Sequence, residues 1–117
     1  MNTEALPNHG RRQLHVDFEI YTEGDKDYKV EMIFHMIKNL KELQNAFRQA
    51  EQERDAAGFK MSCHKAQTVL KILNDGELNR IIDEIKKEIA SGVEAEKILE
   101  FNNLCREIIT SLESEDI

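Results

Sequence analysis

Apolar residues in the last third of the chain recur every three or four positions, the spacing that lines side chains along one face of an α-helix. Two such runs are present, the first made of Leu78, Ile81, Ile82, Ile85 and Ile89 and the second of Ile98, Phe101, Cys105, Ile108 and Leu112. Only residues 90–92 separate them, and so short a connection favours antiparallel packing. The capping-box spacings of Asn74 with Glu77 and Ser91 with Glu94 mark the two starts. The pattern predicts a C-terminal helical hairpin.

A strict alternation of apolar and polar residues covers the region from 14 to 36. The apolar positions are Leu14, Val16, Phe18 and Ile20 before a polar turn, and Tyr28, Val30, Met32, Phe34 and Met36 after it. A period of two is typical of half-buried strands, so these runs predict an antiparallel β-hairpin. A turn centred on Gly24 would place Glu19 opposite Lys29, an attractive pair across the strands.

The middle of the chain predicts a long, mostly polar helix. It would begin at Asn39, which forms a capping box with Glu42, and end near Ala57, because Gly58 suits a left-handed C-terminal residue. Its apolar positions form a narrow seam that resembles one side of a coiled-coil contact. After it, the apolar spacing within 59–73 favours a short helix, although the β-branched residues there also favour a strand.

The predicted fold class is therefore α+β. An N-terminal antiparallel β-hairpin would pack on a bundle of three to four helices that ends in the helical hairpin. We expect one domain over 13–113, a disordered tail over 1–12 and a frayed acidic tail over 114–117. The chain of 117 residues is long enough to bury a core without disulfides or metal.

Composition narrows the classes of function. With 16 basic and 23 acidic residues the net charge is −7, which argues against unaided binding to nucleic acid. No apolar run approaches the roughly 20 residues of a membrane span, and no signal sequence is evident. Cys63 and Cys105 lie far from any cysteine or histidine ligand spacing, which favours a reducing, cytoplasmic setting.

The outward face of the predicted hairpin carries a candidate metal site. Alternation aligns His15, Asp17 and Glu19 on one strand, with Glu31 and His35 on the same face of the next. Opposed side chains lie roughly 5 Å apart across paired strands, close enough for a metal held by imidazole and carboxylate ligands. A solvated sheet face normally carries such residues as well, and this second interpretation is the more economical one.

A basic stretch offers a candidate anion site. Between residues 59 and 74 the charged side chains are Lys60, Lys65 and Lys71, with no acidic residue among them. Backbone amides near Ser62, at the start of a predicted helix, would bind phosphate with Lys60, His64 and Lys65 nearby. The alternative is that these lysines pack beside the acidic last helix. The segment 94–117 carries seven acidic residues against Lys97 and Arg106, so complementary packing is an economical explanation.

Catalysis has little support. Cys63 and His64 are sequence neighbours, and neighbours on a helix point about 100° apart, so they do not face each other. The chain has neither a nucleophile-elbow motif nor a glycine-rich phosphate loop, and we expect no cofactor and no enzyme activity.

The sequence therefore predicts a small acidic protein that binds another protein, such as an inhibitor, adaptor or assembly chaperone, and that forms a homo-oligomer. The predicted interface is the seam of the long helix, made of Leu40, Leu43, Phe47, Ala50 and Arg54. The same seam would equally serve to pack on this chain's own helical hairpin. A hairpin feeding a helical bundle is similar in outline to some small phage-encoded proteins, including tail-assembly chaperones and inhibitors of bacterial defence. The alternative function is capture of a phosphorylated or nucleotide ligand at residues 60–71.

Overall fold

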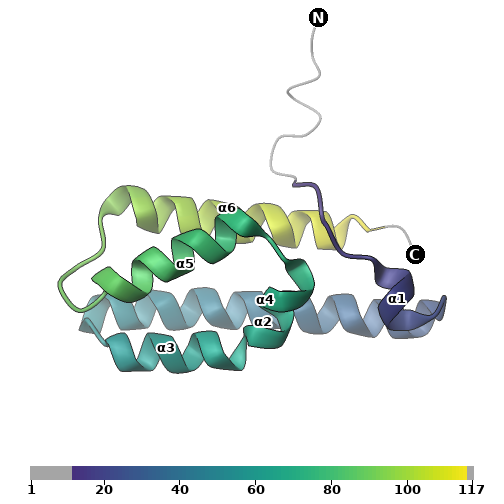
Figure 1. The fold of residues 1–117 in the computed structure, drawn as a ribbon, viewed down its shortest axis with the longest axis horizontal. Coiled ribbons are helices and arrows are strands. Elements are labelled where there is room, and N and C mark those ends of the chain that lie inside the picture. The colour runs from purple at the N-terminus through teal and green to yellow at the C-terminus, as the bar shows by residue number, and fades with distance from the viewer. Residues whose placement is uncertain (1–11, 116–117) are drawn as a thin grey trace, which may run out of the picture.

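Six helices build the protein in the computed structural model, which describes residues 12–115. They are α1 (Phe18–Thr22), α2 (Lys26–Glu53), α3 (Ala56–Lys65), α4 (Gln67–Leu73), α5 (Gly76–Glu88) and α6 (Ala95–Glu113). The long helix α2 runs beside α6, while α3 covers the C-terminal half of α2 and α5 packs along α6 (Figure 1). The other end of α2 is accompanied by α1 and the last part of α6. Most of the predicted tail 1–12 and the end of the predicted tail 114–117 lie outside the described residues.

The core follows one seam along α2 from Ile33 to Ala50. Its buried members are spaced alternately by three and four residues: Ile33, Met36, Leu40, Leu43, Phe47 and Ala50. Phe47 joins three helices, because its ring centroid lies 5.5 Å from that of Phe59 in α3 and 4.9 Å from that of Phe101 in α6. Aromatic pairs at such distances stabilise a core beyond the area they bury.

The expected helical hairpin is present as α5 and α6. Leu78, Ile81, Ile85, Phe101, Cys105 and Ile108 are all fully enclosed in the core. The connection covers residues 89–94, longer than the expected 90–92, because α6 begins at Ala95 with Glu94 as its N-cap. Gly92 turns the chain here with a φ of 112°, a value that side chains disfavour.

The predicted β-hairpin and the α+β class are wrong, because no strand occurs in residues 12–115. Residues 12–17 are extended but unpaired, and the second predicted strand is the first part of α2. Ile33 and Met36 continue the seam of Leu40 toward the N-terminus, so burying that seam requires a helix that includes Ile33, and α2 begins before it at Lys26. The alternation after the turn arose from exposed side chains such as Phe34, which is 64% exposed.

Left-handed residues followed by aspartates make the sharp junctions between helices. Arg54 ends α2 with a φ of 55°, and Asp55 then caps α3; Asn74 ends α4 with a φ of 47°, and Asp75 then caps α5. The aspartate side chains accept hydrogen bonds from backbone N–H groups in the first turns, at 2.8 Å from Gly58 and 3.0 Å from Leu78. Each pair thus satisfies the free groups of two helix ends within two residues.

Several expected helix boundaries are corrected by these junctions. Asn39 lies inside α2 and does not cap a helix, and Gly58 lies in the first turn of α3 rather than at a C-terminus. Residues 59–73 are helical, divided between α3 and α4 by Ala66.

No helix within the described part of the chain is long and apolar enough to span a membrane.

Candidate functional site

The predicted anion-binding residues lie on two different sides of α3. Lys60 and His64, four positions apart, share one face of the helix and line a groove against α4 and α5. Ser62 and Lys65 line a separate cavity against α2, and the Ser62 hydroxyl donates a hydrogen bond to the Gly58 carbonyl at 3.1 Å. The structure therefore brings together only half of the predicted set.

The groove with Lys60 and His64 gathers cations from three helices. Its volume is about 530 Å³, and Lys71 of α4 and Lys86 of α5 join Lys60 at its wall. Amide side chains of Gln67, Asn74 and Asn79 complete the polar lining. We call this the basic groove. Its chemistry suits an anion, although Asp83 lies close enough to oppose part of the positive charge at Cys63.

The lysines of the basic groove do not neutralise the acidic last helix. Within residues 12–115, Lys60, Lys71 and Lys86 form no ion pair. Two carboxylates of α6 are paired elsewhere: Glu100 with Arg80, and Glu107 with Arg12 at 3.7 Å. The groove therefore keeps its lysines available for a ligand from outside.

The predicted interface seam lies inside the molecule. Leu40, Leu43, Phe47 and Ala50 are each no more than 5% exposed, covered by this chain's own helices. Arg54 donates a hydrogen bond to the Ser91 carbonyl at 3.1 Å, which ties the end of α2 to the α5–α6 connection. A partner therefore has no access to this seam while the protein is folded.

The proposed metal ligands are not aligned on paired strands, as the predicted site required. His15 and Asp17 belong to the extended segment, Glu19 to α1, and Glu31 and His35 to α2, with no paired strands to align them. Asp17 instead caps α1 by accepting a hydrogen bond from the Glu19 N–H at 3.1 Å. Across residues 12–115, no group of three histidine, cysteine or acidic side chains could hold a metal ion.

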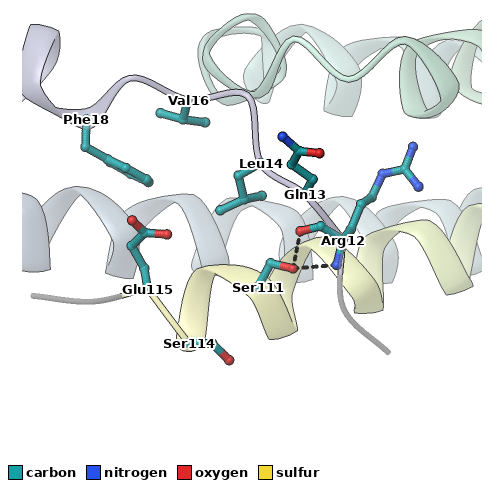
Figure 2. A pocket seen from close by; sticks show the side chains of 8 residues that line it. All are labelled: Arg12, Gln13, Leu14, Val16, Phe18, Ser111, Ser114 and Glu115. Carbon is teal, nitrogen blue, oxygen red and sulfur yellow. Dashed lines mark hydrogen bonds between the residues drawn. The ribbon is translucent and has the colours of Figure 1, made fainter. Parts of the chain in front are cut away.

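A cavity of about 620 Å³ lies between the extended segment and the end of α6. Figure 2 shows Leu14, Val16 and Phe18 along one wall and the polar side chains of Ser111, Ser114 and Glu115 along the other. Ser111 Oγ accepts a hydrogen bond from the Arg12 N–H at 2.7 Å and donates one to the Arg12 carbonyl at 2.5 Å. This reciprocal pair holds the segment in place.

Arg12 itself fastens the segment to α5. Its guanidinium contacts both carboxylate oxygens of Asp75, at 2.6 and 3.1 Å, and also pairs with Glu77. Burial alone would raise the pKa of Asp75, but the hydrogen bonds from Arg12 and from the Leu78 and Glu77 N–H groups lower it below its ordinary value. The network is structural: it joins three parts of the chain, and the carboxylates of Asp75, Glu77 and Glu107 all pair with Arg12.

Both cysteines are poor nucleophiles. Cys63 and Cys105 are free and buried, and desolvation raises their pKa values to about 11 and about 12. A thiol with such a pKa stays protonated at neutral pH, whereas reactive cysteines need a lowered pKa. Nothing at either residue indicates thiol chemistry.

Exposed apolar side chains gather where sequence reasoning did not look for them. Among the described residues, five of the seven large apolar side chains that are exposed belong to α1 and the start of α2: Ile20, Tyr21, Tyr28, Val30 and Phe34. These elements lie together at one end of the molecule (Figure 1). We call this end the apolar end. The predicted hairpin hid it, because a strand pattern assigned Ile20, Val30 and Phe34 to the core.

Comparison with known proteins adds no family: no family model matches the chain, and neither curated proteins nor solved structures gave a match. The function must therefore be inferred from the residues of this chain alone.

Proposed function

We propose that the protein is a non-catalytic binding protein that contacts another protein through its apolar end. The observation that carries the proposal is the concentration of exposed apolar residues in α1 and the start of α2, with Ile20 72% exposed and Phe34 64% exposed. Single exposed apolar residues are normal, but a gathered set marks an interaction surface. Tyr and Phe are also common anchors of protein interfaces.

Roles of this kind include an inhibitor, an adaptor and an assembly chaperone. Such proteins act by covering a partner's surface, which needs neither a cofactor nor a reactive side chain. We place the activity in the cytoplasm, where Cys63 and Cys105 remain free thiols.

Site-specific photo-crosslinking in host cells tests the proposal. A photoreactive phenylalanine analogue is placed at Ile20 or Phe34, and in matched controls at Met61 or Leu99, which are nearly as exposed as Phe34 but lie outside the apolar end. We expect protein adducts from the first pair and few from the second. Equal labelling from all four positions, or adducts only from the controls, would show that the apolar end is not the contact surface.

The basic groove supports a second candidate, the binding of a small phosphorylated ligand. Here the specific observation is that Lys60, Lys71 and Lys86 converge on one groove and are free of ion pairs within the described chain. Isothermal titration calorimetry with ATP and with inorganic phosphate tests it. The triple variant K60A/K71A/K86A should lose the heat of binding, and K65A should keep it, because Lys65 lines a different cavity. A wild-type trace without heat would reject this candidate.

A further inference from the structure

The outward side of α2 carries a regular series of exposed residues. Asp27, Val30, Glu31, Phe34, Lys38 and Lys41 follow one another at helical spacing and are all exposed. Successive residues of a helix turn by about 100°, so this series points away from the core, opposite the buried seam around Met36. We call it the α2 outer face.

Charge along the α2 outer face is divided by Phe34. The acidic residues Asp27 and Glu31 precede it, and the basic residues Lys38 and Lys41 follow it. None of these four side chains has an ion-pair partner within residues 12–115. The face thus has an apolar centre between an acidic half and a basic half, and the charges of both halves are available to pair with another molecule.

The spacing of these charges is nearly symmetric about Phe34. Asp27 and Lys41 each lie seven residues from it, which is about 10 Å along the helix axis in either direction at 1.5 Å per residue. Glu31 and Lys38 lie three and four residues away, respectively. A pattern that is its own complement after a two-fold rotation is what an isologous contact between identical subunits requires.

We infer that the partner of the α2 outer face is a second copy of this chain, packed antiparallel with a two-fold axis at Phe34. This inference rests on the proposed function and names a partner for part of the apolar end. Asp27 then faces Lys41 of the partner subunit, and Glu31 faces Lys38 of the partner subunit. Val30 and Phe34 of both copies fill the centre, which removes two exposed apolar side chains of each copy from water.

The charges also exclude the other helix orientation. In a parallel pair, Asp27 would face Asp27 of the partner subunit and Lys41 would face Lys41 of the partner subunit. Such like-charge contacts are strongly unfavourable across an interface, whereas the antiparallel pair has opposite charges at both positions. The sequence of α2 therefore selects one geometry.

Paired charge reversals test this arrangement by sedimentation velocity. Variant D27K/E31K makes all four charged positions basic, and variant K38E/K41E makes all four acidic. Each variant alone should dimerise about tenfold or more weakly than the wild type, because its two copies repel each other. An equimolar mixture of the two should restore the dimer, and the fourfold reversal D27K/E31K/K38E/K41E should dimerise like the wild type. The control K60E/K65E changes two charges on α3 and should leave the dimer unchanged.

Several results would overturn the inference: a wild type that is monomeric at its highest soluble concentration, single-sign variants that dimerise normally, or a mixture that stays monomeric. Circular dichroism verifies that each variant is folded. A Phe34→Cys variant checks the position of the axis, since mild oxidation should link its copies through residue 34 and leave a Leu99→Cys control unlinked. If the dimer fails while photo-crosslinking at Phe34 still captures a different protein, the proposed function stands and only the self-pairing is rejected.

Discussion

The ion pair between Arg12 and Asp75 holds the extended segment 12–17 on the helical bundle, and replacing Arg12 with Ala tests how much it contributes. The pair is neither exposed nor fully buried: the side chain of Arg12 is 21% exposed and that of Asp75 is 8% exposed. The substitution would leave the Asp75 carboxylate in a nearly enclosed place with only backbone N–H donors. An unpaired charge of this kind is costly.

The magnitude follows from two limits. Exposed ion pairs contribute about 0.2–1 kcal/mol, whereas breaking a buried pair costs about 3–5 kcal/mol. With Asp75 buried and Arg12 half-buried, we expect R12A to lower the free energy of unfolding by about 2 kcal/mol. For a domain of this size that corresponds to a fall in Tm of about 10 °C.

Urea denaturation followed by circular dichroism measures the loss. Arg12→Lys should lose about half as much, because it keeps the charge but not the two-pronged contact with the carboxylate. Arg80→Ala is the matched control, since it breaks the exposed pairs with Glu84 and Glu100 and should change stability far less. A fall of less than about 0.5 kcal/mol for R12A would refute the reasoning.

The pH dependence has a defined sign. Because folding lowers the pKa of Asp75 from its ordinary value of 3.8, the stabilisation is complete above that pH and is lost as the pH falls through the lower native pKa. The difference between wild type and R12A should therefore be constant near neutrality and shrink below about pH 4. A difference that persists unchanged into acid would assign the effect of R12A to packing instead of charge.

Three further predictions concern the core, a turn and the thiols. Phe47→Ala should destabilise the protein by about 3–5 kcal/mol in urea denaturation, whereas Leu99→Ala should change stability by less than about 0.5 kcal/mol; equal losses would contradict the assigned core. Gly92→Ala should cost about 1 kcal/mol or more because of its φ of 112°, and an unchanged midpoint would mean that the connection relaxes. Cys63 and Cys105 should react with a thiol reagent at pH 8 only as fast as the protein opens, and rapid labelling of the native state would contradict their burial.

How far the sequence predicts the fold depends on where its apolar residues point. The α5–α6 hairpin was predictable because nearly all of its apolar residues are buried, so their spacing reports the helix directly. The start of α2 was not, because exposed Val30 and Phe34 interleave with Met32 and Met36 and imitate a strand. The same surface exposure that misled the strand prediction defines the apolar end.

For the candidate sites, residue spacing predicts neighbours within one helix but not neighbours from different helices. Lys60 and His64 were predictable as a pair because four residues separate neighbours on one helical face. Lys71 and Lys86 come from α4 and α5, and only the packing of three helices brings them to the basic groove. Lys65 was wrongly grouped with Lys60, since five residues along a helix turn a side chain well away from its starting direction.

The contacts of Arg12 with Ser111 and Asp75 also suggest an order of events during folding. Arg12 and Ser111 are 99 positions apart, so the start of the chain leaves the ribosome long before its partner in α6 has been synthesised. We expect the segment to dock on a bundle that has already formed, which would place its contacts after the rate-limiting step. We expect R12A to accelerate unfolding and leave the refolding rate unchanged in stopped-flow measurements. The contacts of Arg12 would then slow unfolding of the native protein without contributing to the folding transition state.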